Sequence, residues 1–254
     1  MKKMFEIYHT ANAGLLIKTE NTAILLDALY QSDNDFDPMS DEVKEKLFEP
    51  KGMFTNVDCL LFTHGHYDHY DYQTVRKYIR KYPNTVVAAP EGIYAAGGWT
   101  EVDFSSGKIV MFTDNQDGSF KLNDMEIAYY RTPHMGFDFP KFGFHYSFIV
   151  RKENAASFIS GDTQLTDQLV DVIRSQKNLK AAFFNPIVLQ KKKSRELLRG
   201  LDVEHIFIYH LPQEQNDRFL YRESAVYMLS KYENELPNVQ LLLKEMEEVS
   251  ESRW

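Results

Sequence analysis

The chain has 254 residues, of which 43% are hydrophobic and 14% aromatic, so it can bury a sizeable core and global disorder is excluded. Its formal net charge of −8 excludes a large positive field that would collect nucleic acids or other polyanions. Two local basic clusters, at residues 76–81 and 191–193, are expected to be solvated faces, and no nucleic-acid partner is expected.

The start of the chain, MKKMFEIYHT, is basic, but Glu6, His9 and Thr10 interrupt the apolar stretch that a signal peptide requires. No segment approaches the roughly 18 apolar residues of a membrane span. A single cysteine, Cys59, excludes an intramolecular disulfide. We therefore expect a cytoplasmic protein that does not bind membranes.

Short extended segments open the chain at residues 5–8, 14–19 and 22–26, because β-branched or aromatic residues there alternate with turn residues. Asp27 follows the apolar run AILL and so stands at a strand end. Residues 31–56 are polar and acidic, with a short helical patch at 41–47, and form either a surface excursion or a flap over a site.

The remaining elements alternate between apolar strands and segments with helical spacing. Strands are expected at residues 57–63, 85–88, 108–113, 119–122, 125–131, 146–150, 157–160, 181–184, 205–209 and 239–243. Helices are expected at residues 71–81, 166–175, 191–199 and 222–232. This order predicts two sheets packed together with helices outside, in a single domain over residues 1–254.

Three of the eight histidines lie within six residues, in the string LLFTHGHYDHYD at 60–71. In an extended segment, the spacing of His64 and His66 places both imidazoles on one side. Asp68 and His69 follow where the chain turns into the next helix, so the four side chains can surround a small volume, as a metal or a metal pair requires. The string therefore predicts a metal site.

The string HxHxDH is the signature of the metallo-β-lactamase superfamily, and the rest of the chain resembles that family in order and spacing. Matching features are Asp27 in AILLDALY, His134 in YYRTPH, Asp162 in FISGDT and His210 in IFIYHLP. The resemblance spans residues 5–212, is closest to the lactonase-like group, and implies a four-layer αββα sandwich.

The resemblance also implies the ligand set. One metal would be held by His64, His66 and His134, and a second by Asp68, His69 and His210, with Asp162 bridging both. Asp27 would accept a hydrogen bond from a ligand imidazole and so fix its tautomer. Mixed histidine and carboxylate ligation suits zinc, manganese or iron, and two zinc ions are the expected cofactor.

The third histidine ligand has an alternative, because the long loop after His134 ends in His145. We favour His134, since it directly follows a predicted strand, and expect His145 to touch substrate or form a pocket wall. Phe137 in the same loop and Tyr209 beside His210 are further candidates for a substrate pocket.

Two metals about 3.5–4 Å apart lower the pKa of a shared water towards about 7. The expected reaction is therefore hydrolysis of an ester, lactone or phosphoester bond in a small substrate, with Asp68 orienting the nucleophile and moving its proton. The alternatives are an oxidoreductase with one iron, as in the persulfide dioxygenases of this fold, and a non-catalytic binding protein. The second of these is disfavoured because every ligand position is filled.

Overall fold

The computed structural model describes residues 5–31, 36–96, 99–100, 103, 108–113, 116–135 and 144–249. Within these residues, one seven-stranded sheet has the order β14-β1-β2-β3-β4-β5-β6. Its strands are β1 (Glu6–His9), β2 (Leu15–Lys18), β3 (Ala23–Leu26), β4 (Cys59–Leu61), β5 (Val86–Pro90), β6 (Ile109–Phe112) and β14 (Glu247–Glu248). The strands β3, β4, β5 and β6 run parallel, so their carboxyl ends meet at one edge.

The second seven-stranded sheet has the order β13-β12-β11-β10-β9-β8-β7. Its strands are β7 (Gly118–Leu122), β8 (Met125–Arg131), β9 (Tyr146–Lys152), β10 (Ala155–Ile159), β11 (Leu179–Phe184), β12 (His205–Ile208) and β13 (Val239–Leu241). Here β10, β11, β12 and β13 run parallel, whereas β7, β8 and β9 form an antiparallel meander. Each sheet thus has an edge of carboxyl ends, which is where α/β proteins build sites.

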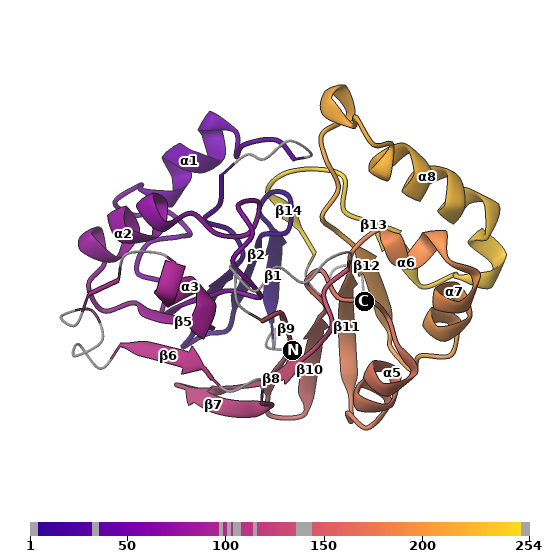
Figure 1. Cartoon of the computed structure of the whole chain (residues 1–254), viewed down its shortest axis with the longest axis horizontal. Helices are drawn as coiled ribbons and strands as arrows, with labels where there is room; N and C mark the ends of the chain where they lie inside the picture. The colour runs from indigo at the N-terminus through magenta and orange to yellow at the C-terminus, as the bar shows by residue number, and fades with distance from the viewer. Residues whose placement is uncertain are drawn as a thin grey trace.

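Helices cover the outer face of each sheet (Figure 1). The first sheet carries α1 (Asp41–Leu47), α2 (Tyr72–Lys81) and α3 (Glu91–Ala96), and the second carries α5 (Asp167–Arg174), α6 (Ile187–Gln190), α7 (Lys192–Arg199) and α8 (Tyr221–Lys231). Side-chain caps begin three of them, because Ser40, Asp71 and Thr166 accept hydrogen bonds from backbone N–H groups of the first turn. Single-turn 3₁₀ helices occupy Glu214–Asn216 and Glu233–Glu235.

Side-chain alternation along the strands divides the core between the layers. In β2, Leu15 and Ile17 belong to the cluster between the two sheets, whereas Leu16 belongs to the cluster under the first helical layer. The third cluster fills the space between the second sheet and its helices. The predicted αββα sandwich is therefore confirmed.

Part of the segment at residues 31–56 packs against the first sheet. Four described side chains in it, Met39, Val43, Leu47 and Phe54, are buried, and α1 has the predicted bounds. Residues 32–35 of the predicted flap lie outside the described residues. No helix in the described ranges is both long and apolar enough to cross a membrane.

A carboxylate joins the edges of the two sheets. Asp124, in the turn between β7 and β8, accepts hydrogen bonds from the hydroxyls of Thr19 and Thr22 in the turn between β2 and β3. It also lies 2.7 Å from the Lys152 ammonium. Burial raises the pKa of Asp124, but Lys152 and the two hydroxyls outweigh it, so the pKa lies below its usual range.

Replacing Asp124 with asparagine should lower the free energy of unfolding by about 1 kcal/mol at pH 7, because solvent screens this half-buried cluster. A carboxylate with a depressed folded-state pKa stabilises the protein above its unfolded pKa of about 3.9 and ceases to do so as the pH falls through the folded value. Urea unfolding at several pH values should therefore show a constant difference from wild type at pH 5–7 that narrows below about pH 4. Glu126→Gln is the matched control, because Glu126 is the exposed residue of β8. An equal loss of stability in that variant would contradict the assignment.

Candidate metal centre

Histidine and aspartate side chains from four strand ends converge between the two sheets. His64, His66 and His134 form one set, and Asp68, His69, Asp162 and His210 form another; the ligand atoms of each set all lie within 4.8 Å of one another. Asp162 follows β10 and His210 follows β12, so the second sheet delivers both at its carboxyl edge. All seven predicted ligands therefore lie together at one site.

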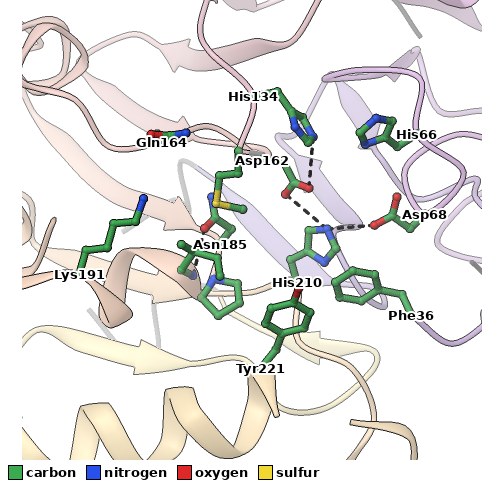
Figure 2. A pocket seen from close by; sticks show the side chains of 13 residues that line it. Phe36, His66, Asp68, His134, Asp162, Gln164, Asn185, Lys191, His210 and Tyr221 are labelled. Atoms are coloured by element: carbon green, nitrogen blue, oxygen red, sulfur yellow. Dashed lines mark hydrogen bonds and ion pairs between the residues drawn. The ribbon is translucent and has the colours of Figure 1, made fainter. Parts of the chain in front are cut away.

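The Asp162 carboxylate lies between the two sets (Figure 2). Its Oδ2 is 3.8 Å from His134 Nε2 and 3.4 Å from His69 Nε2, and its Oδ1 is 3.3 Å from His210 Nε2. Asp68 Oδ2 is likewise 3.3 Å from His210 Nε2. One carboxylate can therefore serve both sets.

Asp27 fixes the orientation of two ligand imidazoles. It is fully buried, and its Oδ2 accepts from His69 Nδ1 at 2.9 Å, which turns Nε2 towards Asp162. The same oxygen accepts the Thr63 hydroxyl at 2.6 Å, and Thr63 Oγ1 in turn accepts from His64 Nδ1 at 2.9 Å. Because Nδ1 of each imidazole donates to its oxygen partner, a bound cation would meet Nε2 of both.

Thr63 is a residue that the motif search did not identify. It also donates its backbone N–H to Asp27 Oδ1 at 2.9 Å, which locks the end of β4 to the end of β3. Its only signal in the sequence is its position directly before the first histidine of the string.

The donor set fits divalent metals. Imidazole nitrogens and carboxylates are ligands for zinc, manganese and iron. His64 Nε2 is buried and has no hydrogen-bond partner within the described residues, and a buried polar atom in that state needs a ligand. The seven side chains therefore suit a mixed nitrogen and oxygen coordination sphere.

The two sets differ in charge. Burial lowers the pKa of His66 to about 4 and, with the neighbouring imidazoles, holds the pKa of His64 well below its usual value, so these two imidazoles are neutral at pH 7. Burial alone would lower the pKa of His210, but Asp162 and Asp68 outweigh it and raise the pKa to about 9. Burial would raise the pKa of Asp162, yet His210 and His69 hold it well below its usual range. Without metal, protons on the imidazoles of the second set balance its carboxylates.

Three residues at the site adopt left-handed backbone conformations. The φ angles are +45° for Asp27, +56° for Gly161 and +59° for His210. A side chain at Gly161 would come within 2.5 Å of His145 Nε2, so glycine is required there. Strained conformations of this kind concentrate at functional sites, where surrounding contacts maintain them.

His145 and Tyr209 lie behind the metal site instead of lining the cavity. Both ring nitrogens of buried His145 are engaged: Nε2 accepts from the backbone N–H of Asp162 at 2.8 Å, and Nδ1 contacts Thr132 Oγ1 at 2.8 Å. Fully buried Tyr209 accepts from the N–H of Gly161 through its hydroxyl at 3.1 Å. Both side chains support the Gly161–Asp162 turn, and neither lines the cavity. The expectation that they form part of the substrate pocket is corrected accordingly. The third pocket candidate, Phe137, lies outside the described residues.

Asn12 connects both ligand-bearing loops to the first sheet. Its side chain donates to the Asp68 carbonyl oxygen at 2.8 Å, and its own carbonyl accepts from the His210 N–H at 3.0 Å. Buried His9 contacts the same carbonyl at 2.8 Å and that of Lys244 at 2.9 Å. The turn after β1 therefore positions ligands through the backbone, as its glycine-containing sequence alone could not indicate.

A cavity of about 390 Å³ opens over the site (Figure 2). Its described lining includes five metal-site residues and eight others: Phe36, Met135, Gln164, Asn185, Pro186, Ile187, Lys191 and Tyr221. The Phe36 ring lies on His210, with centroids 4.1 Å apart, and stacks parallel to Tyr221. None of these eight was predicted, because they come from separate loops and helix ends without a motif.

The sequence matches the profile of the Beta-lactamase superfamily domain over residues 22–220, which is more than half of the chain. The chain belongs to this family. The membership of the metallo-β-lactamase superfamily that the sequence predicted is therefore confirmed.

Several solved structures share this fold at low sequence identity. A novel metallo hydrolase from Ignicoccus hospitalis, Igni18, has a TM-score of 0.62 at 17% identity, covering 97% of this chain and 98% of the other. An isothiocyanate hydrolase from Delia radicum gut bacteria has a TM-score of 0.64 at 15% identity, with coverages of 97% and 100%. CmlA, a diiron β-hydroxylase from Streptomyces venezuelae, has a TM-score of 0.65 at 11% identity, covering 99% of this chain and 55% of its own. No curated protein sequence matches this chain.

Proposed function

We propose that the protein is a metal-dependent hydrolase that uses two divalent cations, most simply zinc, to cleave an ester, lactone or phosphoester bond of a small substrate. The observation that carries this proposal is the Asp162 carboxylate, which faces His134 on one side and His69 and His210 on the other. A carboxylate in that position can bridge two cations, which is the arrangement of two-metal hydrolytic sites.

In this proposal, His64, His66 and His134 hold one cation, and Asp68, His69 and His210 hold the second. Asp27 keeps His69 and, through Thr63, His64 in the tautomer that presents Nε2. When bound, the cations supply an acidified water and an electrophile for the substrate's carbonyl or phosphoryl oxygen.

The remaining chemistry belongs to side chains. The Asp68 carboxylate lines the cavity beside His210, where it can orient water and take its proton. The water oxygen bonds to the carbonyl carbon or phosphorus, the bond to the leaving oxygen breaks, and Asp68 returns the proton to that oxygen. Phe36 and Tyr221 exclude solvent from one wall.

The structural neighbours support hydrolysis, since two of those described above are hydrolases. A diiron β-hydroxylase shares the fold, so an iron oxidoreductase is the competing function. A test must therefore determine both which metal is bound and which reaction is catalysed.

Metal removal provides that test. Chelated protein should be inactive and should regain hydrolysis of a 4-nitrophenyl ester, a lactone or bis(4-nitrophenyl) phosphate as two zinc ions per chain are restored. Elemental analysis of the purified protein gives the stoichiometry. One iron per chain, with oxygen uptake on adding a persulfide and no hydrolysis with zinc, would contradict the proposal and favour the oxidoreductase.

Separate replacement of His134 and His145 distinguishes their roles. His134→Ala should lower the metal content by about one ion per chain, because it removes a ligand of the three-histidine set. His145→Gln retains an oxygen that can accept from the Asp162 N–H, and should keep both ions with a smaller loss of turnover. Loss of metal from the His145 variant alone would exchange the two assignments.

A further inference from the structure

The cavity extends well beyond the metal ligands. Lys191 lies at the opposite end from His66 and Asp68 and extends its side chain along that wall (Figure 2). Its position is at the junction of α6 and α7, where the backbone of the residue is extended. Any substrate long enough to fill the cavity would meet the ammonium of this lysine.

Lys191 differs from its two lysine neighbours. Lys192 lies 3.8 Å from Glu196, and Lys193 forms an ion pair with Asp167. Within the described ranges, the Lys191 ammonium makes no ion pair and no side-chain hydrogen bond, and it is the only lysine or arginine lining the cavity. All three lysines are exposed, as expected of a solvated basic face, but Lys191 also lines the cavity.

The walls between Lys191 and the ligands are largely apolar. Met135, Pro186 and Ile187 form this stretch, and the stacked rings of Phe36 and Tyr221 form the wall beside His210. Asn185 also lines this stretch, but its amide is bonded to backbone groups of Gly161, Thr163 and Ile187. The carboxylates and imidazoles lie at one end of the cavity, and the Lys191 ammonium lies at the other, where Gln164 adds an amide. An apolar middle with polar ends selects an extended ligand with matching ends.

The lysine end has room for a hydrated group. An adjoining hollow of about 260 Å³ shares Met135, Gln164, Ile187 and Lys191 with the cavity and continues to Thr166 and Ser194. An anion beside Lys191 would therefore stay partly solvated, which keeps the cost of its desolvation small.

We infer that Lys191 determines substrate specificity by binding an anionic group, a carboxylate or a phosphate, at the end of the substrate remote from the scissile bond. The substrate class is thus an ester, lactone or phosphoester with a short apolar segment between the reacting centre and the anion. The inference rests on the proposed function for the position of the scissile bond. In a protein of net charge −8, a local cation is needed to hold such an anion.

Matched substrates test this. For zinc-loaded enzyme, kcat/KM should be about tenfold higher for mono(4-nitrophenyl) glutarate or adipate than for the neutral 4-nitrophenyl esters of equal length. Lys191→Met should abolish that preference while leaving the neutral esters unchanged, and Lys191→Arg should retain it. Lys192→Met is the matched control, since that side chain is 84% exposed and does not line the cavity. A preference that survives in Lys191→Met would overturn the inference.

A binding measurement keeps the inference separate from catalysis. By calorimetry, glutaric monoanilide should bind wild type about tenfold more tightly than its methyl ester, and Lys191→Met should remove this difference. The corresponding phosphonobutyric anilide carries a phosphonate in place of the carboxylate. Whichever of the two ligands binds more tightly identifies the preferred anionic group. If no ester is hydrolysed but this difference holds, the hydrolytic function fails and the anion site stands; equal affinity in wild type and Lys191→Met overturns the site.

Discussion

Asp162→Ala is expected to lower hydrolysis by at least about a thousandfold and to remove one or both metal ions. The carboxylate lies within 3.8 Å of imidazoles from both ligand sets, so its loss weakens both cation sites at once. Hydrolysis that requires two bound cations should then fail, because the variant would no longer hold both. Elemental analysis after gel filtration and turnover of the substrate found active in wild type measure the two effects.

Asp162→Asn refines this expectation. The variant keeps the backbone N–H that donates to His145 Nε2 and changes only the charge and one oxygen. We expect it to fold like wild type by circular dichroism, yet to hold no more than one ion tightly. Asp171→Ala, on the exposed face of α5, is the control for a lost surface carboxylate. Full metal content in either Asp162 variant would show that the carboxylate does not bridge.

Much of the fold follows from local patterns. β2 alternates between two apolar environments and β8 has the predicted bounds, because strands that separate a core from a helical layer carry the pattern in their own residues. No local pattern predicted α3, α6 or β14. The two helices have six and four residues, and β14 is a two-residue pairing with β1, so tertiary contacts decide them.

The residues of the metal site likewise fall into those that the sequence predicts and those that only the structure reveals. The four HxHxDH residues lie within six positions, so their spacing alone predicted a metal site there. Asp162 and His210 were expected only from the family resemblance, and they follow strands that end at the same edge of the second sheet. Thr63, Asn12 and Lys191 act through neighbours that are distant in sequence, and each is an ordinary residue in its own segment. The orientation of ligands and the far end of the cavity therefore required the structure.

Asp27 shows how strongly such orientation should matter. Its two oxygens accept from the Thr63 N–H, the Thr63 hydroxyl and His69 Nδ1, all in a fully buried position. Asp27→Ala leaves those donors unsatisfied and should lower the free energy of unfolding by about 3 kcal/mol, as measured by urea denaturation.

Asp27→Asn separates tautomer from fold. Asparagine tolerates the positive φ of this position and can still accept from the Thr63 N–H, so stability should fall less than in the alanine variant. The asparagine amide has only one accepting oxygen, however, and its NH2 group cannot accept a hydrogen bond. His69 therefore loses the partner that keeps its proton on Nδ1. The affinity of the second metal should then fall about 10- to 100-fold, with turnover, in a competition titration against a chelating dye.

Asp58→Asn is the matched control for this argument. Asp58 precedes β4 at the opposite end from the site and accepts from the Ala23 N–H at 2.8 Å, a bond that an asparagine oxygen can also accept. Because both variants replace a strand-end carboxylate beside the β3–β4 pair, a loss of metal affinity confined to Asp27→Asn isolates the hydrogen bond to His69. Wild-type metal affinity in Asp27→Asn would mean that packing alone orients the imidazole, and that the buried carboxylate serves only to join the ends of the two strands.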